Sequence, residues 1–397
     1  MKKKQIWLIL IFAAGVFFSS CETNTNNQAD GDVKMLKAGS VEFKLGYSPS
    51  SIGTVSLSNR EYLYFGDTRT FKCIDIVSFD GSVFSKIPLN EITNLGHQIN
   101  NFYIKSIDSI LVLSLYTNQL FLINNKGNIL KQIDLNRLFK QGKEYGLYSS
   151  IFQDFYFKGK ILLNGHLNVL NEPDPFKDWV QFSKYLNSKI YSEPYFFQIS
   201  NVFSDSISLN TGLDGFYLNF LTPDYEALES PLYYHTENRL FCLSVYSDKI
   251  YEIDPYEFKI IKQITVASDF TKVSEAPVPI NKQTEGKTEV LISNNGQTQG
   301  AIRKLLYDKY RKLFYVFVIH SVNADAPEEK RSMNRPWSLI IYTENFEKIR
   351  EQKMPALHFD ISLAVVCKEG LLISTNNNFN DSYERSKAKL ALFKISN

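Results

Sequence analysis

The chain of 397 residues contains few cysteines, histidines and tryptophans: four, five and three of each. Cys73, Cys242 and Cys367 stand far apart, whereas a disulfide framework or a structural zinc site needs paired or clustered cysteines. We therefore expect all three to be buried strand residues that behave as small hydrophobic side chains. One disulfide between two of them stays open, because an oxidising compartment would allow it.

The sequence also lacks a strong charge of either sign and the familiar catalytic motifs. The formal net charge is +2, and basic and acidic residues are interspersed, so no nucleic-acid partner is expected. There is no Gly-x-Ser-x-Gly nucleophile elbow, no phosphate-binding glycine loop and no His-Glu-x-x-His. No catalytic residue, cofactor or metal site is therefore predicted. Beyond residue 20, no apolar run is long enough to cross a membrane.

The first twenty residues have the pattern of a secretory signal. Three lysines at positions 2–4 precede an apolar stretch over 6–18, and Ser19 and Ser20 lead to Cys21. This junction resembles the lipobox of bacterial lipoproteins, which implies cleavage before Cys21 and acylation on it. We expect a signal peptide over 1–20, a flexible tether over 21–38 and one folded domain over 39–397. The protein would then be lipid-anchored in the cell envelope, at the outer membrane, and would face either the periplasm or the cell surface. The alternatives are an ordinary signal peptide or an uncleaved anchor.

Beyond the tether, the chain is a succession of short strand patterns separated by turn residues. The clearest four-stranded unit spans 99–135, and similar units recur over 232–266 and 302–354. Such repetition indicates an all-β fold, a β-propeller of four-stranded antiparallel blades. Weaker units over 53–89, 152–210 and 360–395 bring the count to six, with seven as the alternative. The last unit offers three strands, and we expect residues 41–46 to supply its fourth and close the ring.

Several strand-and-turn segments carry a family resemblance. They lie at 102–110, 305–315, 340–349 and 369–374. Together they resemble bacterial lipoproteins known as a domain of unknown function with a TolB-like six-bladed propeller. The resemblance covers nearly all of the chain after the signal. It implies the fold and no chemistry, because the family has no assigned catalytic residues.

Four histidines are predicted to share one face of the propeller. Each blade runs from an inner strand a to an outer strand d, so strand a begins and strand b ends on the same face, here called the loop face. The strand pattern places His97, His166, His320 and His358 there, and His235 on the opposite face. Alternatively, these histidines simply bond to neighbouring backbone.

Three long insertions, over 167–194, 267–300 and 321–336, also belong to the loop face. Long loops on a rigid scaffold commonly carry binding. Trp179 lies in the first, and Arg335 and Trp337 end the last. Tryptophan with arginine suits planar or sugar-like ligands. The predicted ligand-binding residues are therefore the four histidines with Trp179, Arg335 and Trp337. Alternatively, the tryptophans seal loops onto the rim.

These patterns favour a binding or protein-interaction module tethered outside the cytoplasm. We expect a monomer whose partner is a protein, a small molecule or a glycan. The main alternative is a propeller enzyme, a metal-dependent hydrolase or lyase with its site at the channel mouth, which would need several ligating side chains to converge. An envelope scaffold is a third possibility. Fold alone does not decide among them.

Overall fold

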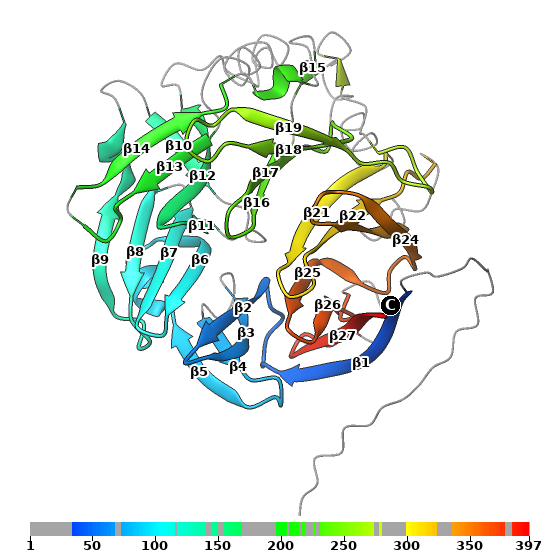
Figure 1. Ribbon diagram of the computed structural model, residues 1–397. Helices are drawn as coiled ribbons and strands as arrows, with labels where there is room; N and C mark the ends of the chain where they lie inside the picture. The colour runs from blue at the N-terminus through cyan, green and yellow to red at the C-terminus, as the bar shows by residue number, and fades with distance from the viewer. Residues whose placement is uncertain are drawn as a thin grey trace, which may run out of the picture.

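The protein is a six-bladed β-propeller (Figure 1). The computed structural model describes residues 34–67, 73–115, 117–139, 144–148, 155–168, 196–204, 206–214, 216–219, 225–226, 231–273, 278–279, 299–323, 335–377 and 383–396. Within these residues nearly all regular structure is β, and α1 (Asn90–Asn94) is the one α-helix. The all-β, six-bladed prediction is therefore confirmed.

The first three blades follow one another along the chain. Blade 1 contains β2 (Ser51–Leu57), β3 (Arg60–Asp67), β4 (Cys73–Val77) and β5 (Val83–Pro88). Blade 2 contains β6 (Gln98–Ser106), β7 (Ser109–Leu115), β8 (Gln119–Ile123) and β9 (Ile129–Asp134). In blade 3 the inner strand has two pieces, β10 (Glu144–Tyr148) and β11 (Tyr156–Phe157), which both pair with β12 (Lys160–Asn168). β13 (Phe196–Ser200) and β14 (Ser208–Gly212) complete this blade.

The remaining blades follow the same plan. Blade 4 contains β16 (Leu232–His235), β17 (Leu240–Leu243), β18 (Lys249–Ile253) and β19 (Ile260–Thr265). Blade 5 contains β21 (Ala301–Asp308), β22 (Leu313–Ile319), β23 (Trp337–Thr343) and β24 (Lys348–Met354). Blade 6 is built from β25 (Asp360–Cys367), β26 (Gly370–Ser374), β27 (Lys387–Ser396) and β1 (Lys34–Lys44). A small pair, β15 (Tyr225–Glu226) with β20 (Val278–Pro279), stands outside the blades.

Blade 6 joins the two ends of the described chain. β1 is antiparallel to β27, with Val41 opposite Leu390 and Phe43 opposite Ala388. The predicted closure is thus present, and it removes the open edge that the last blade would otherwise expose. β1 begins at Lys34, so residues 34–38, expected in the tether, belong to the strand. Met35, which is buried, explains why the strand reaches that far.

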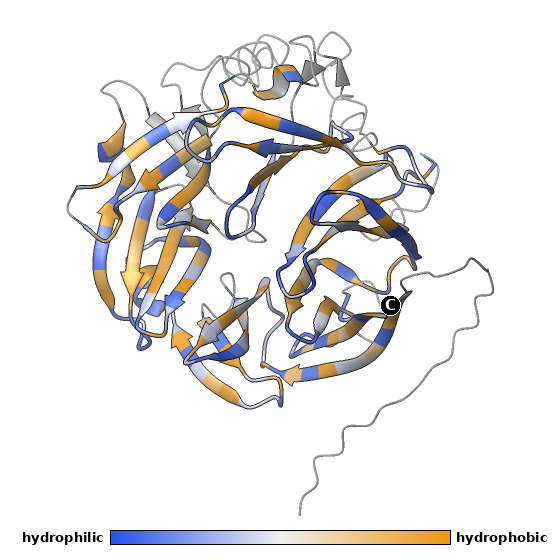
Figure 2. Ribbon diagram, viewed as in Figure 1, coloured by the Kyte–Doolittle hydropathy of each residue, from blue (hydrophilic) through white to orange (hydrophobic). Residues whose placement is uncertain are grey.

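Apolar packing between neighbouring blades holds the ring together. Because side chains alternate across a strand, Ile110 and Val112 of β7 pack toward blade 1, whereas Leu111 and Leu113 pack toward blade 3. Middle strands such as β26 are therefore buried along their whole length, and outer strands such as β24 are largely polar (Figure 2). Both faces of a middle strand are covered, so its sequence is continuously apolar rather than alternating.

The three internal cysteines follow from the same packing. Cys73, Cys242 and Cys367 are free and buried in β4, β17 and β25, as predicted. Burial raises the pKa of Cys73 and of Cys367 to about 11, so both stay neutral thiols. In the part of the chain that the structure describes, no helix has the length and apolar character needed to cross a membrane.

Candidate functional site

The residues predicted to bind a ligand are spread over blades 2, 3, 5 and 6. His97 immediately precedes β6, His320 immediately follows β22, and His358 lies two residues before β25. Trp337 opens β23, with Arg335 two residues earlier. His166 belongs to β12, but its side chain lies outside the described residues, as does Trp179.

Trp337 and His358 meet through one phenylalanine at the junction of blades 5 and 6. The indole of Trp337 is buried and stacks on Phe317, with ring centroids 5.6 Å apart. Its other neighbour, Phe359, makes edge contacts with Trp337 at 6.0 Å and with His358 at 4.6 Å. Trp337 is therefore a packing residue here, and His358 is an exposed neighbour of that packing.

His320 is buried beside this group, whereas His97 is satisfied within its own blade. The His320 ring stacks on Phe270, and burial, assisted by the charges of Lys353 and Arg335, lowers its pKa to about 4. His97 Nδ1 lies 3.1 Å from Thr117 Oγ1. The structure thus gathers His320, Arg335, Trp337 and His358 around blades 5 and 6 and leaves His97 in blade 2. Their role in ligand binding stays a prediction.

Two connected cavities lie along the axis of the ring. The inner one, the hub chamber, has a volume of about 250 Å³, and its polar lining includes Ser51, Thr54, Tyr64, Asn101, His235 and Lys304. The outer one, the mouth cavity, has a volume of about 480 Å³, and its lining includes Tyr103, Tyr156, Lys158, Glu237, Lys309 and Tyr310. Both are lined by Thr54, His235, Tyr307 and Val366, which form the neck between them.

The mouth cavity opens on the face opposite the loop face. Lys158, Glu237 and Lys309 belong to or adjoin the turns that join strands a and b, and these turns define what we call the hairpin face. His235 is the last residue of the inner strand β16, so it also lies toward the hairpin face. Both cavities are therefore lined by His235, the one histidine that the strand pattern placed on the face opposite the other four.

Irregularities in three inner strands shape the chamber. The ladder register shifts between Ile99 and Asn101 in β6, between Ile302 and Lys304 in β21, and between Asp360 and Ala364 in β25. A bulge re-aims the next side chain and leaves backbone groups of the bulged residues outside the ladder. Asn101, Lys304 and Ala364, which directly follow these shifts, all line the chamber.

Lys304 is the one charged side chain among the described residues that line the hub chamber. It is 5% exposed, and its Nζ donates a 2.7 Å hydrogen bond to the carbonyl oxygen of Ser362, inside the β25 bulge. Burial lowers the pKa of Lys304 to about 7, and the charge of Asp360 partly offsets this effect. Lys304 is therefore far easier to deprotonate than an exposed lysine.

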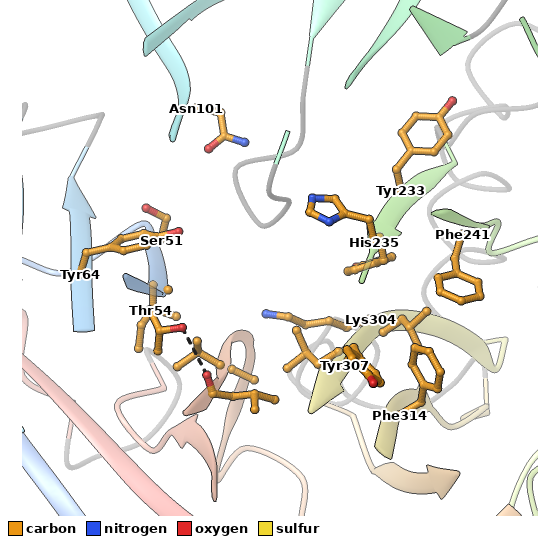
Figure 3. A pocket seen from close by; sticks show the side chains of 18 of the residues that line it. Ser51, Thr54, Tyr64, Asn101, Tyr233, His235, Phe241, Lys304, Tyr307 and Phe314 are labelled. Carbon is orange, nitrogen blue, oxygen red and sulfur yellow. Dashed lines mark hydrogen bonds between the residues drawn. The ribbon is translucent and has the colours of Figure 1, made fainter. Parts of the chain in front are cut away.

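Side chains from other blades surround this ammonium group (Figure 3). His235 extends from blade 4 toward the open centre, and its Nδ1 lies 3.1 Å from the carbonyl oxygen of Thr236. Asn101 enters from blade 2, with its Oδ1 fixed by a 2.8 Å hydrogen bond from the backbone N–H of Phe102. The chamber thus combines groups from separate blades, as a ligand site at a propeller axis would require.

Blade 1 forms the opposite wall. Tyr64 covers Gly53, where a Cβ atom would lie 2.2 Å from the tyrosine ring, so only glycine leaves room for it. Ser51 is 6% exposed, and its Oγ has no hydrogen-bond partner. A buried hydroxyl without a partner is unusual in a folded protein. This wall therefore offers a flat aromatic surface beside a hydroxyl that is ready to bond.

The chamber is rich in hydrogen-bond donors and poor in negative charge. No carboxylate occurs among its described lining residues. In the described part of the chain, no group of three or more His, Cys, Asp or Glu side chains is placed to hold a metal ion. The arrangement is suited to recognising a small polar ligand that accepts hydrogen bonds.

Sequence reasoning did not identify Lys304, although it left a signal. Residues 301–306 are apolar except for the adjacent pair Arg303 and Lys304, which interrupts an inner strand. Two consecutive cations break the alternation expected of a strand. A charged residue at such a position is either at a bulge or directed into a channel, and Lys304 is both.

Comparisons with solved structures support the fold. A member of the DUF4221 family from Bacteroides vulgatus superposes with a TM-score of 0.69 and 19% sequence identity, covering 93% of this chain and 100% of that one. A protein of Bacteroides fragilis, whose name describes it as exported, gives a TM-score of 0.53 at 10% identity, covering 94% and 98%. No protein-family model matches the chain. No curated protein matches its sequence.

Proposed function

We propose that this protein is a lipid-anchored binding protein outside the cytoplasm, and that its propeller binds a small ligand in the hub chamber. The proposal includes acylation at Cys21, kinship with the DUF4221 family, and attachment to the outer membrane as a monomer. The signal-like start of the chain supports export, as does the structural likeness to a Bacteroides protein named as exported.

The observation that carries the binding role is a polar chamber built by five blades at once. Its lining comes mainly from the inner strands of blades 1, 2, 4, 5 and 6, with Tyr64, Phe241 and Phe314 added from second strands, and an aromatic mouth cavity leads into it. At the mouth, Tyr103 and Tyr156 stack with ring centroids 4.3 Å apart. Concave sites with a few convergent polar groups among apolar walls are typical of small-molecule binding.

Blocking the neck tests this role. Thr54→Trp places an indole where the two cavities meet, and Thr265→Trp makes the same change at an exposed position on the outer strand β19. A panel of sugars, amino acids and aromatic acids is screened by thermal shift on the full chain. Ligands of the chamber should raise the melting temperature of the wild type and of Thr265→Trp by a few degrees, and leave Thr54→Trp unchanged. Equal shifts in all three proteins would place binding elsewhere.

A metal-dependent enzyme is the alternative function. The described chamber offers one histidine, His235, and no carboxylate to such a mechanism. The geometry therefore supports binding better than metal-assisted hydrolysis. Turnover of a chamber ligand by the wild type, lost in Thr54→Trp, would favour the enzyme instead.

The loop face stays the predicted surface for ligand or partner contacts by His97, His166, His320, His358, Trp179, Arg335 and Trp337. Arg335 and Trp337 are each 1% exposed, so replacing either by alanine would perturb packing as well as contacts. His358, which is exposed, is the better position for testing that surface.

A further inference from the structure

We infer that the hub chamber binds a small organic monoanion, a carboxylate, with Lys304 as its counter-ion. The inference rests on the proposed function, because it names the ligand class of that same site. Three independent features lead to it: the buried ammonium group, the donor-rich lining and the size of the chamber.

The first feature is an uncompensated buried cation. Lys304 makes its hydrogen bond to a carbonyl oxygen, and no described carboxylate lies within ion-pair distance of Nζ. Lysine is rarely this buried unless it is paired, since burying an isolated charge is costly. Asp360 influences Lys304 only through its more distant charge. The missing negative partner is best supplied by a ligand.

The second feature is the distribution of donors and aromatic surface. An ionised carboxylate only accepts hydrogen bonds and has about four acceptor positions. Ser51, whose Oγ lacks a partner, lies across the open centre from Lys304 (Figure 3). The rings of Tyr64 and Phe102, 5.4 Å apart, provide an apolar wall for the rest of the ligand.

The third feature is size and charge balance. A dry cavity of roughly 150 Å³ accommodates benzene, so about 250 Å³ suits a single ring carrying a carboxylate. One lysine balances one negative charge. Among the residues that line the mouth, the two lysines Lys158 and Lys309 outnumber the one carboxylate, Glu237.

The experiment compares three carboxylates with a neutral and a cationic analogue. Binding of benzoate, 4-hydroxyphenylacetate and acetate to the full chain is measured by calorimetry at pH 6.5, beside benzamide and benzylamine. At least one carboxylate should bind more than tenfold tighter than benzamide, and benzylamine should not bind. Lys304→Met should weaken that carboxylate at least tenfold and leave benzamide unchanged. Lys262→Met, which removes the same charge at an exposed position on the outer strand β19, should stay within threefold of wild type.

A proton readout separates a counter-ion from a merely structural lysine. Binding should take up protons at pH 7.5, and affinity should fall as pH rises from 7 to 9 while Lys304 loses its charge. Other ionisable groups facing the chamber are His235, Tyr64, Tyr233, Tyr234 and Tyr307, with Asp360 behind the β25 bulge. The proton uptake should therefore be absent in Lys304→Met and retained in His235→Gln.

Two different failures are distinguishable. Equal binding of benzoate and benzamide, unaffected by Lys304→Met but abolished by Thr54→Trp, would overturn the carboxylate assignment and keep the hub as a ligand site. Failure of all three carboxylates to bind the wild type at millimolar concentration would also overturn the carboxylate assignment. Carboxylate binding that survives Thr54→Trp would contradict the hub site itself.

Discussion

Tyr310 donates a 2.5 Å hydrogen bond from its phenol to Oε1 of Glu61, and thereby links the inner hairpin of blade 5 to that of blade 1. The other carboxylate oxygen, Oε2, accepts a 2.8 Å bond from the backbone N–H of Lys368 in blade 6. One carboxylate thus ties three successive blades on the hairpin face. Burial and the neighbouring Glu61 raise the pKa of Tyr310, so the phenol remains a donor at every physiological pH.

Removing this link should loosen the mouth more than the fold. Glu61→Ala is expected to cost only about 1 kcal/mol, because the bonds lie near the surface. The amide of Lys368 should exchange with solvent markedly faster, which hydrogen–deuterium exchange would detect. Tyr256→Phe, at an exposed tyrosine on the β18–β19 turn, is the control and should leave exchange unchanged. Unaltered exchange at Lys368 in Glu61→Ala would contradict the link.

Closure of the ring should depend on Phe43. This side chain of β1 is 2% exposed and contacts Phe65 of blade 1, with ring centroids 5.2 Å apart. Phe43→Ala is expected to lower the free energy of unfolding by about 3–5 kcal/mol, through lost packing and a cavity. Leu36→Ala, on the same strand at 53% exposure, should change it by less than about 0.5 kcal/mol. Similar denaturant midpoints for both variants would argue against a stabilising closure.

Lys304 should reduce stability rather than increase it. Its folded pKa, about 7, is lower than that of lysine in an unfolded chain, so unfolding takes up protons between these values. Native stability therefore rises as pH increases from 7 toward 10. Lys304→Met should be more stable than wild type at pH 7, with the advantage shrinking as pH approaches 10. Guanidinium denaturation at several pH values measures this, and Lys309→Met serves as control. A strongly destabilised Lys304→Met would identify a structural role instead.

Anchoring should depend on Cys21. Cys21→Ser should move the protein from the membrane fraction to the soluble fraction and abolish incorporation of labelled palmitate. Cys73→Ser is the matched control for labelling, because that thiol is buried in β4 and neutral. Equal labelling of wild type and Cys21→Ser would refute lipidation at this position.

The recurrence of short apolar segments between turn residues was enough to predict the blades, because an apolar segment directly indicates a buried strand. The apolar runs of β7 and β26 reflect packing on both sides of a strand, which each residue shows locally. The turn at Asn124 was equally readable. Its Oδ1 accepts bonds from the N–H groups of Lys126 and Asn128, and Gly127 adopts a positive φ.

The hub chamber was not predictable in the same way. Asn101, His235 and Lys304 are more than sixty residues apart in sequence and meet only because their inner strands converge on one axis. Lys304 also depends on a one-residue register shift in β21. Such a shift moves a side chain from one face of a strand to the other, and its trace in the sequence is the pair of adjacent cations Arg303 and Lys304. Histidine is a common binding and catalytic residue, so a pattern of histidines predicts a site. A lysine in a strand predicts an exposed position, because lysine is rarely buried.

The pairing of β1 with β27 also sets the order of events in folding. Lys34 lies opposite Ser396, so the first described strand to be synthesised must wait for the last before it gains a partner. Contacts this distant in sequence form slowly, because the chain must pay the entropy of a long loop before they stabilise it. Until β27 has been synthesised, blade 6 therefore lacks the strand that β1 pairs with. A premature stop before β27 would leave that unfinished edge permanently exposed, which marks the incomplete chain for aggregation or proteolysis.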